Sequence, residues 1–598
     1  MTQNGSSPTV TVLRPRESDK EHVSLQALQE RWPKVMKPME LVDAMLSPSR
    51  WRCSLTPDSG KKHALAVDST RLTTILSKCF GLLSPLRSIL VSRSPRLAEA
   101  DWQVRKHVWS VLWGAAVLYR LRPKTPPVPK DEKKISLIPA PATYSDFRSE
   151  LLVVPDDVSC AEASVSGDLS VQLFHLLQDV FPIITAHQPV ASFDPEQRLR
   201  DAYTSFYRLI RTPPHWHPEL KQAAREKNLL GALATGGPFA KLLERAEPGS
   251  LHPYKIDLTH MTAYPVRPGL AVLGCRINFD APGGKLSVAN VEYAGTAVAP
   301  GEARWDFIER IALCSLVTHL TVWRHGMQYH VAGLAPVAVV THNMPANHPI
   351  RRLLAAHVWE TISTNFYTHL TLRRSGFDVT GFSFPRDVIF RYYDDGARAF
   401  DLRWLDLETD AERRGIDGDL DYPYLPLAQR YRDLIRSYVS AYVDLYYEDD
   451  AALDGDHDAQ AWFDALDANF LNGIRYYVPE LTKENLVKFC TLFIYAVTVE
   501  HEQNTLWDYS VFLPTTVRED GVGQSMGEVQ SVLNFQLVIA SATNRLLNDV
   551  SHLALDDRAA QVMRDFQSAL RALQSEMEQG PDHYWLVYPK DLEASVSA

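Results

Sequence analysis

The sequence lacks most of the features that would assign it quickly to a structural class. Its six cysteines are spread over 598 residues without a CxxC pair, which predicts free thiols in a reducing compartment rather than disulfides or a zinc ribbon. Basic side chains do not outnumber acidic ones (62 against 72), which argues against nucleic-acid binding driven by charge. The motif HExxH and phosphate-cradling glycine loops are also missing, which disfavours a mononuclear metal hydrolase.

The sequence also has no apolar run that matches the thickness of a bilayer, which needs about 20 residues. The two most apolar runs, residues 108–121 and 332–340, are shorter than that. The first twenty residues lack the apolar stretch of a secretory signal. These absences predict a cytoplasmic protein without a transmembrane segment, limited to transient contact with a membrane surface, and they leave its oligomeric state open.

What is present is the composition of a globular protein, 45% apolar and 22% charged, in a chain long enough for several domains. We expect residues 1–20 to be disordered and residues 21–121 to be helical, because the run at 108–121 is apolar almost all round. Residues 122–146 are rich in proline and charge, which is typical of an extended linker or a long surface loop. Residues 147–598 would then form the main domain.

The main domain is predicted to be mostly helical. Apolar residues recur every three to four positions over residues 434–446 and 562–577, and Gly580-Pro581 would end the second of these helices. A β-hairpin is expected where residues 270–280 and 285–293 flank a turn that contains two glycines. The sequence therefore predicts a mainly α fold with a small antiparallel β excursion.

Histidine is concentrated in one part of the chain. Seven of the twenty histidines lie within 51 residues, where a uniform distribution would place fewer than two. They are His319, His325, His330, His342, His348, His357 and His369. Neutral imidazole is the commonest metal ligand in proteins, so the enrichment indicates a metal site, although single histidines on helices are more often surface or buried structural residues.

The spacing of two of these histidines suggests how they would meet. His325 and His330 are five residues apart, which separates them by about 140° on an ideal α-helix. A π-type turn would bring both onto one face, and such turns often occur at functional sites. The apolar sequence on either side predicts burial, and a buried imidazole pair needs a partner.

A second apolar helix offers further ligands around residue 501. His501 follows the run FIYAVTVE, and Asn504 and Thr505 come three and four residues later, near the same helix face. Glu500 and Glu502 lie about 100° to either side and are less well placed, although a glutamate would complete a non-heme iron site of two histidines and one carboxylate. The residues alone leave open which group joins His501, and whether His501 is structural.

Several segments together resemble the lipoxygenase family, over most of the chain after about residue 195. Lipoxygenases carry two iron-ligating histidines five residues apart on one helix, as His325 and His330 are here, followed by a His-Pro pair and a further histidine. The segment MPANHPIRRLLAAH is similar to that part of the family and contains His348 and His357. The resemblance implies that these last two lie around the ligands rather than among them.

Two further segments extend the resemblance. LTKENLVKFCTLFIYAVTVEH resembles the family helix that carries the third histidine ligand, and DLEASVSA resembles the C-terminus, whose main-chain carboxylate coordinates the iron in the family. The implied ligands of a mononuclear non-heme iron, with manganese as the alternative, are His325, His330, His501, Ala598 and either Asn504 or Thr505.

The resemblance also implies how a substrate would be held. The family position that governs the stereochemistry of oxygen insertion corresponds to Thr368, followed by His369 where the family has Arg. The leucines implied to line a long apolar cavity are Leu353, Leu354, Leu372 and Leu546. The N-terminal region is not similar to the lipid-binding β-sandwich of plant and animal lipoxygenases, so residues 147–598 would be the catalytic domain and the helices before them an extension.

The implied activity is hydrogen abstraction from a bis-allylic CH₂ of a polyunsaturated fatty acid and insertion of O₂, with a hydroperoxide as product. Its partners would be a lipid-like small molecule and O₂, and no nucleic acid. One alternative is an oxygenase on the same scaffold that acts on a non-fatty-acid small molecule or secondary metabolite, suggested by the departures at Thr368 and near Asn504. A second alternative is a metal-free, lipid-binding pseudoenzyme.

Overall fold

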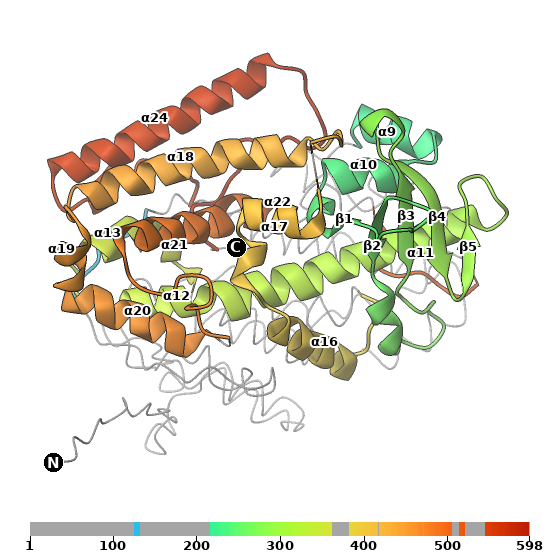
Figure 1. Cartoon of the computed structure of the whole chain (residues 1–598), viewed down its shortest axis with the longest axis horizontal. Helices are drawn as coiled ribbons and strands as arrows, with labels where there is room; N and C mark the ends of the chain where they lie inside the picture. Colours follow the sequence, from blue (N-terminus) through green and yellow to red (C-terminus); the bar gives the residue numbers. More distant parts are fainter. Residues whose placement is uncertain are drawn as a thin grey trace, which may run out of the picture.

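The computed structural model describes residues 125–131, 216–361, 382–416, 418–470, 472–504, 513–520 and 544–596. The first described elements are α9 (Pro218–Arg225), α10 (Leu229–Thr235), η4 (Ala240–Leu242), β1 (Glu244–Arg245), β2 (Tyr254–Asp257), η5 (Thr259–Ala263), β3 (Arg276–Asp280), η6 (Pro282–Gly284), β4 (Ser287–Tyr293) and β5 (Thr296–Val298). They form a small sheet with short helices at one end of the molecule (Figure 1).

Helices make up most of the remainder. In chain order they are α11 (Trp305–Thr318), η7 (His319–Leu334), α12 (Ala335–His342), α13 (Pro349–Val358), α16 (Arg386–Arg398), η8 (Leu402–Trp404), α17 (Leu407–Arg414), α18 (Tyr424–Asp444), α19 (Asp450–Asp454), α20 (His457–Asn469), α21 (Lys483–Tyr495), η9 (Ala496–Glu500), α22 (His501–Asn504), η10 (Ser551–Leu553) and α24 (Asp557–Gln579). One large hydrophobic cluster joins the sheet to these helices.

The predicted hairpin is confirmed as the pair β3 and β4, within an antiparallel sheet whose strands follow one another in sequence order from β1 to β5. Its turn has positive φ at Gly283 (63°) and Gly284 (82°), a conformation that favours glycine. A Cβ on Gly284 would also lie 2.5 Å from the backbone oxygen of Asp419. The other strands, β1, β2 and β5, were not predicted, because they are only two, four and three residues long.

One long helical rod crosses the molecule, formed by α11, η7 and α12 in direct succession (Figure 1). Its backbone stays right-handed through the junction at His319. Helix α16 packs closely against η7 because two glycines lie at the contact. A Cβ on Gly396 would be 3.2 Å from the Trp323 ring, and one on Gly326 would be 3.3 Å from Tyr393.

Helices α18, α21 and α24 lie side by side with the rod beneath them (Figure 1). The two long helices predicted from apolar periodicity are confirmed as α18 and α24. Their contact includes Tyr438 and Phe566, whose rings stack with centroids 4.5 Å apart. Helix α24 begins after Asp556, which accepts a hydrogen bond from the backbone N–H of Ala559, and it ends at Gly580.

The described part of the proline-rich segment, residues 125–131, is neither helix nor strand. It is held to the helical body by three hydrogen bonds. Asp131 accepts one from the backbone N–H of Ala346 (2.7 Å), Arg351 donates one to the carbonyl oxygen of Lys130 (3.1 Å), and His552 pairs with the carbonyl oxygen of Pro126 (2.8 Å). The predicted regions 1–20 and 21–121 lie outside the described residues, so the domain boundaries stay predictions.

Among the described residues, Cys275, Cys314 and Cys490 are buried free thiols, as predicted; the other three cysteines lie outside them. None of the described helices combines the length and the apolar character that a membrane crossing requires.

Candidate metal centre

Two histidines of the candidate site lie on η7, a stretch of π-helix. In a π-helix the backbone hydrogen bonds join residues five apart, so residues i and i+5 face the same side. The Nε2 atoms of His325 and His330 accordingly lie 2.8 Å apart, and their ring centroids lie 4.7 Å apart. The π-type turn predicted from the five-residue spacing is therefore confirmed.

The third histidine comes from the neighbouring rod of α21, η9 and α22. His501 is the first residue of α22 and directly follows the π-helical turn η9. Its Nε2 atom lies 3.3 Å from Nε2 of His330, and its ring centroid lies 4.6 Å from that of His325. The structure thus brings together three imidazoles that are up to 176 positions apart in the sequence.

All three imidazoles are buried, with exposed fractions of 8%, 4% and 0% for His325, His330 and His501. Burial lowers the pKa of His325 and of His501 well below the usual value, and the neighbouring imidazoles lower both further. Both rings are therefore neutral at physiological pH and keep a nitrogen lone pair. The Nδ1 atoms of these two rings have no hydrogen-bond partner among the described residues.

The three nitrogens fit a single transition-metal ion. Two ligands at about 2.1 Å from an ion and at right angles to each other are about 3.0 Å apart, and the two Nε2 separations, 2.8 and 3.3 Å, lie on either side of that value. Imidazole ligands suit zinc, copper, iron and nickel, whereas magnesium, calcium and manganese are better suited to oxygen ligands. The His325, His330 and His501 set is therefore suited to hold a redox-active metal.

The other clustered histidines have structural partners. His319 pairs with the hydroxyl of Tyr392 (2.7 Å), and His342 is buried at the end of α12. His348 caps α13, accepting a hydrogen bond from the N–H of Ile350, and its Nε2 donates to Asp456 (3.0 Å). His369 lies outside the described residues. The enrichment in histidine thus marks the right region, but among its described members only His325 and His330 belong to the candidate site.

His357 fastens the C-terminal tail. Its Nδ1 donates to the carbonyl oxygen of Ala594 (2.7 Å), and Ser595 donates to the carbonyl oxygen of Trp359 (2.8 Å) while it accepts from Asn544 (2.7 Å). Residues 592–596 are all buried. The tail therefore runs through the interior beside α13 up to the last described residue.

The tail also reaches the candidate metal centre. One ring nitrogen of His501, one oxygen of Glu502 and one oxygen of Glu593 lie within 4.8 Å of one another. Burial, and next the neighbouring Glu593 carboxylate, raise the pKa of Glu502 well above the usual range. Glu593 was not singled out from the sequence, although it lies within the tail DLEASVSA.

The remaining predicted site residues divide into two groups. Leu353, Leu354 and Leu546 are buried in the main hydrophobic cluster, and Asn504 is the last residue of α22. Residues predicted from the resemblance but outside the described part of the chain are Thr368, His369, Leu372, Thr505 and Ala598.

Glu500 does not join the histidines, although its carboxylate was weighed as a ligand. It is fully buried and accepts hydrogen bonds from the hydroxyls of Tyr329 and Tyr424, both at 2.9 Å. The Lys241 ammonium lies 2.7 Å from the same carboxylate. Tyr329 directly precedes His330, and Glu500 directly precedes His501. The hydrogen bond between Tyr329 and Glu500 therefore joins the two helical segments that carry the histidines.

No protein-family model matches the chain. Curated relatives include a polyunsaturated fatty acid lipoxygenase (ALOX15B) of Rattus norvegicus, 27% identical over 234 residues, which are 36% of this chain and 33% of the relative. Linoleate 9S-lipoxygenase 1 of Hordeum vulgare is 26% identical over 294 residues (44% and 31%). A manganese lipoxygenase of Pleurotus sapidus is 27% identical over 216 residues (34% and 32%). The matches span about a third of the length of these relatives.

Solved structures match over more of the chain. A coral 8R-lipoxygenase has a TM-score of 0.61 at 13% identity, with 83% of this chain and 81% of that one covered. A calcium-dependent 11R-lipoxygenase has a TM-score of 0.60 at 16% identity, with 70% and 72% covered. The predicted mainly α fold with a small antiparallel sheet is thereby confirmed, and it is the fold of these enzymes.

Proposed function

We propose that this chain, whose relatives and fold support its assignment to the lipoxygenase family, is a non-heme metal dioxygenase that inserts O₂ into a polyunsaturated fatty acid. The product would be a hydroperoxide. The observation that carries the proposal is the convergence of three buried imidazole nitrogens from two helical rods, His325, His330 and His501. A fatty-acid substrate is supported by the relatives, several of which are named for one.

The metal would be iron or manganese, held by these three histidines. When bound, it would supply the one-electron chemistry needed to begin oxidation of a bis-allylic C–H bond. A named manganese lipoxygenase among the relatives supports manganese as the alternative to iron. Asn504 or Thr505 and the carboxylate of Ala598 stay predictions as further ligands.

The chain itself would prepare the site in two ways. Burial keeps His325 and His501 neutral, so their lone pairs need no deprotonation before they bind a metal. The apolar residues around the rods exclude water, which would protect a carbon radical until O₂ arrives. Leu353, Leu354, Leu372 and Leu546 as the lining of the substrate cavity, and Thr368 and His369 as determinants of stereochemistry, stay predictions.

Incubation with linoleate and with arachidonate tests the proposal. Protein produced with iron or with manganese should form conjugated-diene hydroperoxides, detected by ultraviolet absorbance and by mass spectrometry. The variant His330→Ala should form none. The matched control is His583→Ala, which removes a partly exposed histidine paired with Glu219 and should leave the rate unchanged.

Two negative results would point to the alternatives. Metal near one equivalent per chain without diene formation would favour an oxygenase that acts on another small molecule or secondary metabolite. Metal far below one equivalent, in cells supplied with both ions, would favour a metal-free lipid-binding protein. The cytoplasmic location predicted from the sequence stays a prediction.

A further inference from the structure

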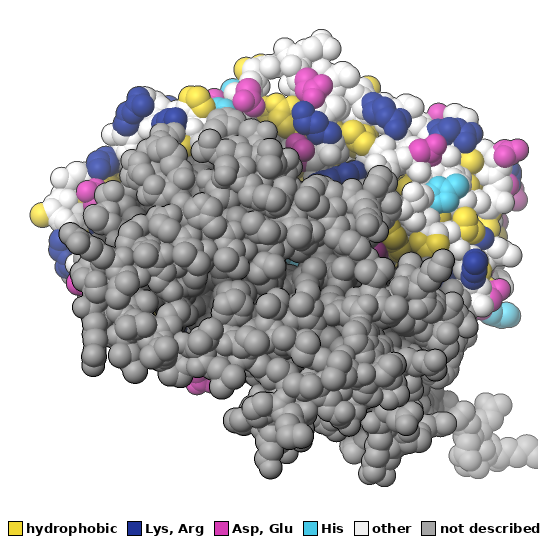
Figure 2. All heavy atoms as spheres, turned by 180° about the vertical axis from the view of Figure 1, so that it is seen from behind, with side chains coloured by type: hydrophobic (Ala, Val, Ile, Leu, Met, Phe, Trp, Pro, Cys, Tyr) yellow, Lys and Arg dark blue, Asp and Glu magenta, His cyan; other side chains and the backbone are white. Residues whose placement is uncertain are grey.

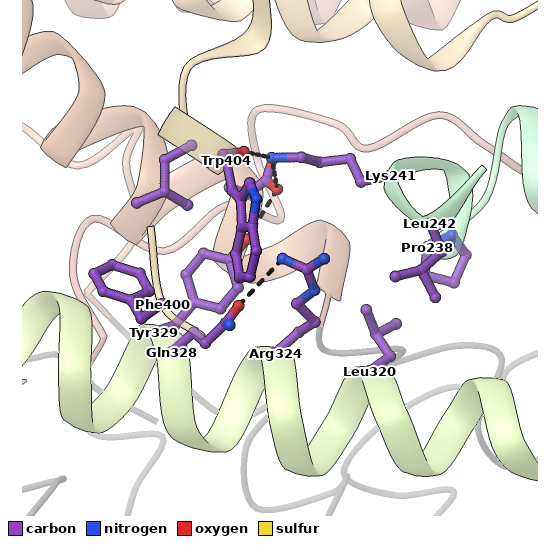
Figure 3. Close-up of a pocket in the computed structure, with 11 residues that line it drawn as sticks. Pro238, Lys241, Leu242, Leu320, Arg324, Gln328, Tyr329, Phe400 and Trp404 are labelled. Atoms are coloured by element: carbon purple, nitrogen blue, oxygen red, sulfur yellow. Dashed lines mark hydrogen bonds and ion pairs between the residues drawn. The ribbon is translucent and has the colours of Figure 1, made fainter. Parts of the chain in front are cut away.

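A second group of polar side chains lines a small hollow between η7, η8 and η4 (Figure 3). Arg324 reaches the hollow from η7, Trp404 from η8 and Lys241 from η4. None of the three histidines of the candidate metal centre lines it. The free space within the hollow is about that of one water molecule, so an occupant is either a single water or a monatomic ion.

Two side chains that line the hollow each have a buried N–H group without an acceptor among the described residues. The two nitrogens are Nε of Arg324 and Nε1 of Trp404. The side chains lie against each other, with Cζ of Arg324 4.2 Å from the centre of the Trp404 ring. Within the described part of the chain, Arg324 donates only to Gln328, over a long 3.3 Å. Guanidinium and indole nitrogens can donate but not accept, so an occupant that completes this site must accept hydrogen bonds.

Cationic side chains outnumber carboxylates around the hollow. Lys241 is paired with Glu500 (2.7 Å), and Asp410 is shared between Arg413 (3.0 Å) and Arg414 (2.8 Å). With Arg324, four cations therefore meet two carboxylates of the described residues, and neither carboxylate pairs with Arg324. On the surface seen from behind, by contrast, the described basic and acidic side chains lie interspersed (Figure 2). A largely buried cation without a counter-ion costs free energy, which a bound anion would offset.

A halide ion meets these requirements better than a water molecule does. A halide only accepts hydrogen bonds and carries a negative charge, whereas a water molecule would add two O–H donors and leave the charge of Arg324 uncompensated. Polyatomic anions such as carboxylates, phosphate and sulfate are larger than the free space. Among the halides, chloride is larger and less strongly hydrated than fluoride, so its transfer out of water costs less free energy.

We propose that this hollow binds one chloride ion, which accepts hydrogen bonds from Nε of Arg324 and Nε1 of Trp404. The ion neutralises the guanidinium that directly precedes His325 in the sequence. It also joins η7 to η8, the two segments that carry its donors. The site is separate from the candidate metal centre, and its occupancy does not require a metal.

Broadening of the chloride NMR signal by the full chain tests the proposal, with sodium gluconate replaced by sodium chloride at constant ionic strength. We expect saturable broadening that bromide removes by competition. Acetate and phosphate should not compete, because they are larger than the hollow. Competition by acetate or phosphate as strong as that by bromide would overturn the proposal, and so would the absence of saturable broadening.

Two variants test the two donors separately. Arg324→Gln should weaken chloride binding at least about tenfold, because the charge and its hydrogen bond are lost together. Trp404→Phe keeps an aromatic ring beside the guanidinium but removes the indole N–H, and it should weaken binding by about fivefold. Unchanged affinity in both variants would show that chloride binds elsewhere.

The matched control is Arg413→Gln. Arg413 also faces the Trp404 ring, with Cζ 5.2 Å from its centre, but its side chain is 44% exposed, is paired with Asp410 and does not line the hollow. This variant should bind chloride within about twofold of the unaltered protein, and circular dichroism would verify that all three variants fold. Equal losses in Arg413→Gln and Arg324→Gln would indicate a general effect of positive charge and would overturn the proposal.

Two further measurements locate the ion. Crystals grown with bromide in place of chloride should show an anomalous peak beside Nε of Arg324 and Nε1 of Trp404, and a water molecule at that position would contradict the proposal. The variant His330→Ala should still bind chloride, so failure of the proposed oxygenase function would leave this inference intact. Loss of chloride binding in His330→Ala would place the ion at the candidate metal centre and overturn the inference.

Discussion

Two groups of side chains come from the same two helical rods and differ in how their polar atoms are satisfied. In the histidine group, His325 and His501 each have a buried Nδ1 without a partner among the described residues, and the Nε2 atoms face one another. In the neighbouring group, both oxygens of Glu500 accept hydrogen bonds from tyrosine hydroxyls, and Lys241 balances the charge. The second group is satisfied by its own side chains, whereas the first has ring nitrogens that could hold a metal ion.

The Glu500 group has the bonding expected of a structural cluster, and the histidine group has that expected of a binding site. Buried polar groups are normally hydrogen-bonded, and a group that is not needs an explanation. The Glu500 group joins the two rods, because Tyr329 and Glu500 come from different ones. We therefore infer that the Glu500 group sets the distance between the two helical segments that carry the histidines.

Loss of one histidine should have the largest effect. His330→Ala should reduce the metal content from about one equivalent per chain to almost none, because Nε2 of His330 lies 2.8 and 3.3 Å from Nε2 of the other two histidines. Elemental analysis of the purified protein measures this, with His583→Ala as the control. A metal-loaded His330→Ala variant would show that the ion binds elsewhere.

Loss of the Glu500 charge should have the next largest effect, a decrease in folding stability. The Lys241 side chain is only 11% exposed, and Glu500→Gln would leave its ammonium without a counter-ion. Breaking a buried ion pair lowers the free energy of unfolding by about 3 kcal/mol or more. Glu576→Gln is the matched control, because Glu576 pairs with Arg430 at the surface and such pairs contribute roughly 0–1 kcal/mol. Urea denaturation compares the two, and equal losses would mean that the buried pair is not structural.

A buried histidine outside both groups provides a reference for pH dependence. Burial lowers the pKa of His357 to about 4, against an ordinary 6.5, although its bond to Ala594 opposes the shift. The unfolded chain therefore binds a proton that the folded chain does not between pH 6.5 and 4, so stability is full above pH 6.5 and falls as the pH is lowered. The loss from this residue should reach about 3 kcal/mol near pH 4.

Denaturation of the unaltered protein and of His357→Gln at pH 7, 5.5 and 4.5 measures that contribution. The variant should be less stable at pH 7 and should lose less stability on acidification. Parallel pH profiles for the two proteins would mean that His357 is not the buried neutral histidine described here.

The smallest expected effect distinguishes two tyrosines that bind the same carboxylate. Tyr329→Phe and Tyr424→Phe each remove one 2.9 Å hydrogen bond to Glu500, and each should cost about 1 kcal/mol of stability. Only Tyr329 is next to a histidine of the candidate site, so only Tyr329→Phe should accelerate metal loss to a chelator, by several-fold. Equal rates in the two variants would contradict a role for Glu500 in setting the histidines.

The sequence predicted those features that a local pattern encodes. Regular apolar spacing predicted α18 and α24, two adjacent glycines predicted the β3–β4 turn, and the five-residue interval between His325 and His330 predicted the π-helix η7. The second π-helical turn, η9, was not predicted. It precedes a single histidine, so no spacing between two histidines indicates a π-turn there.

Features that depend on distant residues were out of reach. The partners of Glu500 come from positions 241, 329 and 424, and no pattern within any one segment connects them. The same is true of Arg324. No carboxylate of the described residues pairs with it, because Asp410 and Glu500 are paired with other cations.

Anomalous X-ray diffraction at the iron and manganese absorption edges would show whether His325, His330 and His501 hold one metal ion. We expect a single strong peak about 2.1 Å from one ring nitrogen of each histidine, at one edge or the other. A peak bound by other residues, or none in crystals grown from protein produced with both metals, would contradict the account.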